Sequence, residues 1–160
     1  MVIDDHPAPT GLSMKTPNVA RVWDYQLGGK DNFAPDREAA EALNDACRRV
    51  GAPDGRVVAR ENRDFIGRAV RYLAGPAGIR QFIDVGAGLP TQGNVHQIAQ
   101  QVNPDAVVVY VDYDPLVLVH GRALLADNAN TVVIQADARE PNHILTHPEL
   151  REVIDLDRFP

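Results

Sequence analysis

The feature that most constrains the fold is the alternation of short β-branched runs with helical stretches after Gly78. Three runs are typical of strands: QFIDV (81–85), AVVVYV (106–111) and TVVIQ (131–135). The middle run is apolar throughout, as expected of a strand that is buried on both faces of a sheet. This β-α-β-α-β order predicts an α/β fold with a parallel sheet and right-handed crossovers.

Local signals also predict where the helices of this second half begin. Asn94, with Gln97 three residues further on, resembles a capping box. Asp114 and Pro115 form an N-cap and N1 pair, which predicts a helix that runs to about Ala126. We therefore interpret Asp114 as a cap rather than as a ligand-binding acid.

The first half of the chain lacks strand-like runs and is predicted to be helical. Thr16-Pro17 is typical of an N-cap and N1 pair, and Gly28 is expected to end this first helix. Two further helices are expected over residues 36–50 and 56–74. The expected organisation is a disordered tail over 1–16, a helical cap or lid over 17–77 and an α/β half-domain over 78–160.

Each helix of the cap has an apolar stripe that is expected to face inward. The stripe residues are Val19, Val22, Trp23 and Leu27 in the first helix, Ala39, Ala40, Leu43, Ala46, Cys47 and Val50 in the second, and Val58, Phe65, Ile66, Ala69, Val70 and Leu73 in the third. Trp23 is interpreted as a core anchor. The arginines at 60, 63, 68 and 71 are interpreted as a solvated helix face rather than a phosphate-binding surface.

Composition excludes several classes of function. The net charge of −6 disfavours wrapping of duplex DNA, because neutralisation of phosphates dominates that affinity. Cys47 is the single cysteine, so the sequence predicts neither an intrachain disulfide nor a cysteine metal cluster. His143 and His147 are four residues apart, but Pro148 argues against a helical zinc pair. No run is long enough to span a bilayer, and the N-terminal residues do not resemble a secretory signal, so a cytoplasmic location is expected.

Acidic residues follow or end each of the three predicted strands. These are Asp84 in the first, Asp112 after the second and Asp137 after the third. Ligands of parallel α/β sheets collect at the carboxyl ends of the strands, where these acids are expected to lie together. Gly86 and Gly88 permit a tight turn after the first strand. A carboxylate such as Asp112 suits a ribose diol, because it offers acceptors and no donor.

The glycine turn departs from a dinucleotide-binding motif. Pro90 and Thr91 occupy the region where the third glycine is expected, so helix and strand are not arranged for a pyrophosphate. Asp84 would also repel phosphates and attract a cation. A ligand that combines adenosine with a positive charge and has no phosphates is S-adenosylmethionine. This argument disfavours the alternative of an NAD-dependent dehydrogenase.

Three short segments, DVGAG, YVDYDP and QADA, look like the glycine-rich, ribose-binding and adenine-binding motifs of Rossmann-like S-adenosylmethionine-dependent methyltransferases. Longer segments resemble the bacterial S-adenosyl methyltransferase family, once catalogued as a domain of unknown function. These segments are VWDYQLGGKDNFAPDR (22–37), RENRDFIGRAVRYL (60–73), QFIDVGAGLPTQGNVH (81–96) and VVYVDYDPLVLVHGRALL (108–125). The resemblance covers about residues 17–158.

The resemblance implies a cofactor site and a reaction class, methyl transfer to an unknown acceptor. A small-molecule acceptor is favoured over a nucleic acid, and no catalytic base is predicted. Asp84 and the glycine turn would face the methionyl and ribose groups, Asp112 would bind ribose, and an N-terminal lid would cover the cofactor. The expected cofactor-binding residues are Asp84, Gly86, Ala87, Gly88, Asp112, Tyr113, Asp137, Ala138 and, in the lid, Tyr25, Gly29 and Asn32.

The resemblance also implies a seven-stranded sheet, of which this chain supplies strands 1–3. We therefore expect a truncated domain that lacks measurable activity by itself. The strand 81–85 would then be a sheet edge with apolar residues and no lysine or proline, which favours self-association. A non-catalytic protein that binds the cofactor or a partner is the alternative.

Overall fold

The computed structural model describes residues 14–90, 93–124 and 128–157. Most of the predicted tail, residues 1–13, therefore lies outside the described residues. Three helices form the cap: α1 (Val19–Gln26), α2 (Ala34–Arg49) and α3 (Gly55–Ala74). The second half contains β1 (Gln81–Val85), α4 (Val95–Val102), β2 (Val107–Asp112), α5 (Pro115–Leu124), β3 (Thr131–Gln135), α6 (Pro141–Leu145) and α7 (Pro148–Val153).

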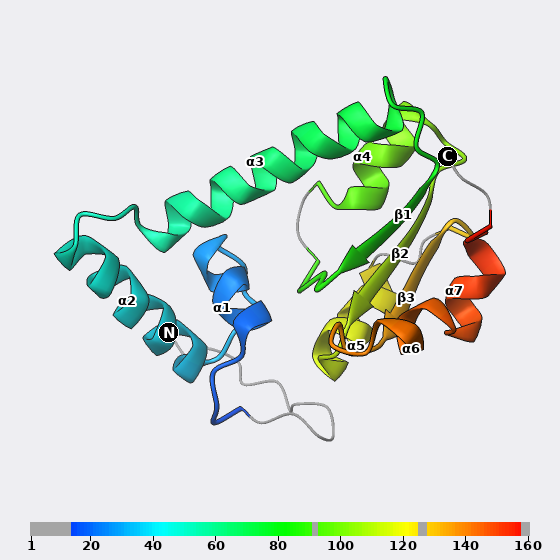
Figure 1. The fold of residues 1–160 in the computed structure, drawn as a ribbon. Coiled ribbons are helices and arrows are strands. Elements are labelled where there is room, and N and C mark those ends of the chain that lie inside the picture. Colours follow the sequence, from blue (N-terminus) through cyan, green and yellow to red (C-terminus); the bar gives the residue numbers. More distant parts are fainter. Residues whose placement is uncertain (1–13, 91–92, 125–127, 158–160) are drawn as a thin grey trace.

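The three strands form the predicted parallel sheet, in the order β1-β2-β3. Phe82 pairs with Val108, and Tyr110 pairs with Val133. In Figure 1 the long α3 crosses from the cap to the sheet, where it lies beside α4. The predicted α/β fold and its parallel β-α-β-α-β order are confirmed.

Helices cover both faces of the sheet. On one face, buried residues of α3 and α4 pack with β2 and β3 in a core that includes Val70, Ile98 and Val108. On the other face, Ile144 of α6 and Leu150 of α7 pack against the sheet. Residues of β2 alternate between the two cores, so this strand is buried on both faces, as its apolar sequence predicts.

The predicted start of α1 is wrong. The N-cap is Asn18, whose side chain accepts a hydrogen bond of 2.8 Å from the backbone N–H of Ala20. Thr16 instead contributes its carbonyl oxygen, which accepts a hydrogen bond of 2.8 Å from Arg21. The helix ends as predicted at the glycines, with Gly28 in the left-handed region at a φ of 81°.

The predicted inward stripes of the cap are also largely wrong, because α1 and α2 pack through polar side chains. The buried residues of α1 are Arg21, Asp24 and Gln26, and those of α2 are Asp36, Ala40 and Asn44. Several predicted stripe residues are exposed instead: Val19, Trp23, Leu43, Ala46, Val50, Val58, Phe65 and Leu73. Ala40 of α2 and Val70 of α3 are buried as predicted. In α1, by contrast, the polar face is the buried one.

A network of buried polar groups holds α1 against α2. The Arg21 guanidinium donates from Nε to Asp36 at 2.8 Å, and both side chains are at most 3% exposed. The Asp36 carboxylate also accepts hydrogen bonds from the backbone N–H groups of Asn18 at 2.8 Å and Phe33 at 2.9 Å. Because each buried charge has partners, the desolvation cost of this pair is offset.

No helix of the described residues has the length and apolar character needed to cross a membrane.

Candidate functional site

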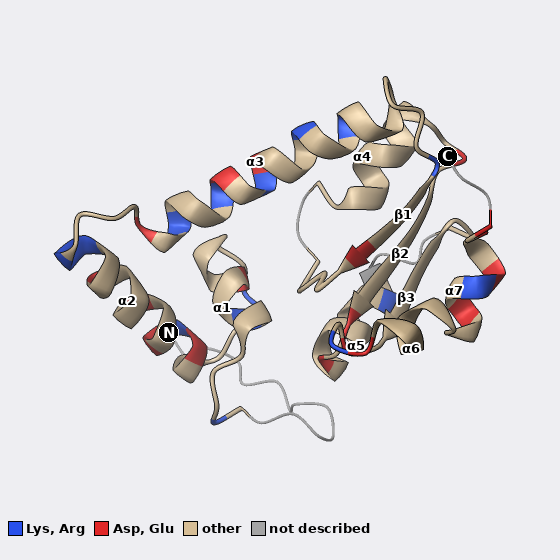
Figure 2. Ribbon diagram, in the orientation of Figure 1, with Lys and Arg blue, Asp and Glu red and all other residues tan. Residues whose placement is uncertain are grey.

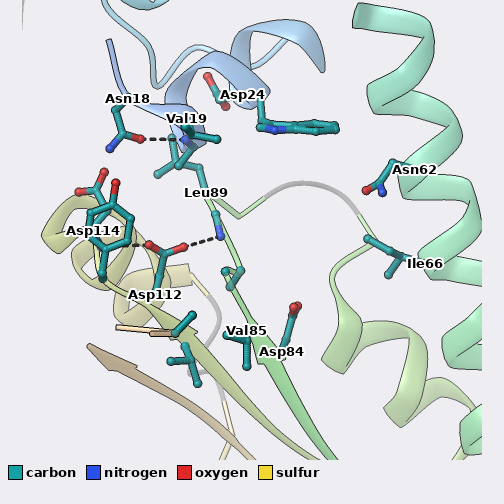
Figure 3. Close-up of a pocket in the computed structure, with 18 of the residues that line it drawn as sticks. Asn18, Val19, Asp24, Asn62, Ile66, Asp84, Val85, Leu89, Asp112 and Asp114 are labelled. Atoms are coloured by element: carbon teal, nitrogen blue, oxygen red, sulfur yellow. Dashed lines mark hydrogen bonds between the residues drawn. The ribbon is translucent and has the colours of Figure 1, made fainter. Parts of the chain in front are cut away.

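A cavity of about 390 Å³ lies where the cap meets the carboxyl edge of the sheet. Its residues come from the ends of β1 and β2, from the segment after β3, and from α1 and α3 of the cap. Figure 3 shows Asp84 and Asp112 on the sheet side, with Asp24 and Val19 on α1 across the pocket. The acids at the ends of the first two strands therefore meet at one site, as the sequence predicts.

The glycine turn after β1 is fixed to β2 by its backbone. Gly86 and Gly88 have φ angles of 75° and 68°, which favour glycine over other residues. The N–H groups of Gly86 and Ala87 donate to the carbonyl oxygen of Val111 at 2.8 and 3.2 Å. The turn is therefore a rigid wall of the cavity rather than a loose connection.

Asp112 links the two turns that border the pocket. One carboxylate oxygen accepts a hydrogen bond of 2.9 Å from the N–H of Gly88, and the other accepts one of 3.0 Å from the N–H of Asp114. The side chain is buried, and each oxygen retains a second acceptor position. Asp112 is thus held in place with capacity for two further donors.

Asp114 is the N-cap of α5, as predicted. Its Oδ1 accepts a hydrogen bond of 2.8 Å from the N–H of Leu116. The residue is 3% exposed and lines the cavity, and its Oδ2 has no hydrogen-bond partner among the described residues. Asp114 therefore contributes negative charge to the pocket as well as capping the helix.

Asp84 of β1 and Arg63 of α3 both border the cavity. Burial raises the pKa of Asp84, the Arg63 cation opposes this shift, and the nearby Asp112 adds to it. Burial in turn lowers the pKa of Arg63, while Asp84 opposes that change. The two groups are thus an electrostatic pair within the pocket.

The interpretation of the α3 arginines as a solvated face is wrong for Arg63. Figure 2 shows basic residues along the length of α3, and Arg60, Arg68 and Arg71 are exposed. Arg63 is only partly exposed, because α3 turns this position toward the strand ends. Arginine spacing alone does not reveal which position faces a cavity.

The apolar side of α1 lines the pocket instead of packing in a core. Val19, Ala20, Trp23 and Leu27 all border the cavity. Val19 is 69% exposed and Trp23 is 40% exposed, so the interpretation of Trp23 as a core anchor is wrong. Ala20 also packs beside the cluster of Leu89, Leu116 and Val117, which joins the cap to α5. These residues form an apolar surface opposite the acidic strand ends.

The three residues predicted for the lid do not border the cavity. The Tyr25 hydroxyl donates to Glu41 at 2.7 Å, away from the pocket. Asn32 donates to the Asp24 carboxylate at 2.8 Å and to the Gly29 carbonyl oxygen at 3.0 Å. Asn32 and Gly29 therefore support Asp24, a pocket residue that the sequence did not single out.

The segment after β3 contributes alanines to the pocket. Ala136 and Ala138 border the cavity, as does Tyr113 after β2, whereas Asp137 does not. The Asp137 carboxylate instead accepts hydrogen bonds from the side chain of Arg139, which lowers the pKa of Asp137 to about 2. In this structure Asp137 is already paired on the surface.

The charges around the cavity favour a ligand with positive charge. In the part of the chain that the structure describes, four carboxylates border it, from Asp24, Asp84, Asp112 and Asp114, together with one guanidinium, that of Arg63. Low dielectric strengthens such charges, so an anionic pyrophosphate would be repelled. Among the described residues, no group of histidine, cysteine or acidic side chains is arranged to hold a metal ion.

The chain is similar in sequence and in fold to known proteins. Residues 5–159 match the model of a family described as S-adenosyl methyltransferase. The crystal structure of a candidate methyltransferase from Thermobifida fusca has a TM-score of 0.85 and 55% identity, and covers 94% of this chain and 55% of its own. A protein of the duf574 family from Streptomyces avermitilis has a TM-score of 0.83 and 44% identity, and covers 91% of this chain and 54% of its own. The chain thus spans about half the length of these structures. No curated protein matches it.

Proposed function

Because the chain belongs to the S-adenosyl methyltransferase family, we propose that its pocket binds S-adenosylmethionine and provides the cofactor side of a methyl transfer. S-adenosylmethionine is the cofactor of this family. The observation that carries the proposal is the acidic cavity at the strand ends, which suits a ligand with two positive charges and no phosphate.

The adenosine part of the cofactor fits the β2 side of the pocket. Asp112 has acceptor capacity left for the two ribose hydroxyls, and the unpartnered oxygen of Asp114 adds an acceptor nearby. Tyr113 and Ala138 offer surfaces for the adenine ring. Asp137 would reach the adenine amine only by releasing Arg139.

The methionyl part fits the β1 side. Asp84 suits its ammonium group, and Arg63 suits its carboxylate, so the pair matches a zwitterion. Gly86 and Gly88 leave open space beside the turn for the cofactor, and Ala87 also borders the cavity. In this proposal Tyr25, Gly29 and Asn32 act from behind, because they hold α1 and Asp24 over the ligand.

The cofactor, when bound, supplies a methyl group activated by a sulfonium. The residues of this chain then bind the cofactor, orient it and limit the access of water. Positioning of the two reactants accounts for much of the rate in such displacements.

Ligand choice tests the proposed function. S-adenosylhomocysteine is expected to bind the purified chain in titration calorimetry, whereas NAD is expected to give no binding heat, because its pyrophosphate would meet the four carboxylates. Adenosine is a matched control for the shared nucleoside. Tight NAD binding without any response to S-adenosylhomocysteine would overturn the assignment.

The acceptor is proposed to be a small molecule, because the chain carries a net charge of −6 and several carboxylates border the cavity. A cytoplasmic location is part of the same proposal. The single cysteine, Cys47, fits a protein of a reducing compartment.

We also propose that the chain self-associates through β1. This strand pairs with β2 alone in the described sheet, and a second cavity, of about 850 Å³ and partly lined by Gln81 and Ile83, lies beside it. Light scattering over a concentration series is expected to show growth in mass, because unpaired backbone groups recruit another strand. A monomer at every concentration would contradict this proposal.

A further inference from the structure

Within the described part of the chain, Asp24 is the one carboxylate of the pocket that comes from the cap. Asp84, Asp112 and Asp114 lie at the ends of β1 and β2, whereas Asp24 lies on α1, across the cavity (Figure 3). Asp24 borders the cavity and is 4% exposed, so its carboxylate is shielded from bulk water. The proposed cofactor contacts leave it without a role.

Neighbouring groups fix the position of the Asp24 side chain. Asn32 donates to Oδ2 at 2.8 Å, and the backbone of Asp31 donates a further hydrogen bond. Gly29 lies directly against the other oxygen: a Cβ at this position would stand 1.9 Å from Oδ1. Glycine is therefore required here for the carboxylate to keep its place.

The electrostatic surroundings of Asp24 differ from those of Asp84. Burial is the largest cause that raises the pKa of Asp24, and the charge of Asp31 acts in the same direction. The opposing cation is His120 of α5, which carries charge only when protonated. Asp84 has the permanent cation of Arg63 instead. A new donor or cation in the pocket would therefore stabilise the charged form of Asp24 more than that of Asp84.

We propose that Asp24 faces the methyl group being transferred and binds the acceptor, an amine or hydroxyl compound whose nucleophilic atom carries a proton. This inference rests on the proposed function. Asp84 and Asp112 mark the methionyl and ribose ends of the cofactor on the sheet side. The sulfonium joins those two parts, so a group on the opposite wall faces the sulfonium and its methyl group.

The chemical step balances with Asp24 as proton acceptor. The nucleophilic nitrogen or oxygen forms a bond to the methyl carbon, and the carbon–sulfur bond breaks. Its electron pair stays on sulfur, which becomes the thioether of S-adenosylhomocysteine. The proton of the acceptor passes to the Asp24 carboxylate. A carboxylate whose affinity for protons is raised by burial is better suited to this task than an exposed one.

The test compares two ligands that differ at the reacting position. Sinefungin carries an amine-bearing carbon where S-adenosylhomocysteine has sulfur, and this extra ammonium takes the place of the transferred methyl group. The ratio of the two affinities, measured by titration calorimetry on the full chain, isolates the contact with that ammonium. In Asp24→Asn the ratio is expected to fall by about tenfold or more, the usual weight of a hydrogen bond to a charged group. Affinity for S-adenosylhomocysteine should change little.

Two variants complete the design. Asp112→Asn is expected to weaken both ligands equally and leave the ratio unchanged. Gly29→Ala keeps the Asp24 charge but displaces its carboxylate, so the affinity ratio should fall here too. If Asp24→Asn does not fold, Gly29→Ala provides the test. An unchanged ratio, or equal loss of both ligands in the Asp24 variant, overturns the inference. If the wild-type chain binds neither ligand, the proposed function fails instead.

Discussion

Asp112→Ala is expected to remove most of the affinity of the chain for S-adenosylhomocysteine. The substitution deletes the proposed acceptor of two ribose hydroxyls, and a hydrogen bond to a charged group contributes about 1.5–3 kcal/mol. It also frees the N–H groups of Gly88 and Asp114, which the carboxylate now fixes at 2.9 and 3.0 Å. Titration calorimetry is the measurement, and we expect a loss of at least about 1.5–3 kcal/mol in binding free energy.

The matched control is Asp114→Ala, two residues further along the chain. Loss of an N-cap is expected to lower the free energy of unfolding by about 1 kcal/mol, with a smaller effect on affinity. Urea denaturation and calorimetry on both variants separate the two roles. The reverse pattern, with affinity lost mainly in the Asp114 variant, would mean that the ribose-binding acid has been misassigned.

Asp36→Ala is expected to have the largest effect on stability. The substitution leaves the Arg21 guanidinium buried without its carboxylate and removes the acceptor for the N–H groups of Asn18 and Phe33. Removal of one partner from a buried ion pair costs about 3–5 kcal/mol. Urea denaturation monitored by circular dichroism is expected to show a loss of this size.

Glu38→Ala provides the control for this second prediction, because Glu38 lies on the same helix and is exposed. Surface substitutions of this kind usually change the free energy of unfolding by less than about 0.5 kcal/mol. Equal stability of the two variants would show that the Arg21–Asp36 pair does not hold α1 against α2.

The strands and their order could be predicted from local sequence alone. QFIDV and TVVIQ form β1 and β3 with the predicted bounds, and β2 is shifted by a single residue to Val107–Asp112. The β-branched residues, the glycine turns and the Asp114 cap all indicate the same structure. Helices α6 and α7 were not predicted, because each is too short to show periodicity and their main signal is a proline at the first position.

The cap could not be predicted to the same degree, because its packing reverses the usual pattern. Polar residues such as Arg21, Gln26 and Asn44 look solvated in sequence, yet their side chains are buried. Gln26 pairs with Asn44, and Arg21 pairs with Asp36. The apolar stripe of α1 then lines the cavity. For the same reason the sequence did not single out Asp24 or Arg63, whose place in the pocket depends on how the cap packs on the sheet.

The polar packing of the cap also has a consequence for how a ligand enters. Segments of a protein that make few buried apolar contacts unfold locally at a lower free-energy cost than the core of a domain. The contact between α1 and α2 depends on hydrogen bonds rather than on buried hydrocarbon, whereas the sheet is enclosed by two apolar clusters. Transient opening of α1 and α2 would therefore expose the cavity while the sheet stays folded. A ligand that bridges α1 and the strand ends would suppress this opening. Ligand binding would therefore stabilise the folded cap.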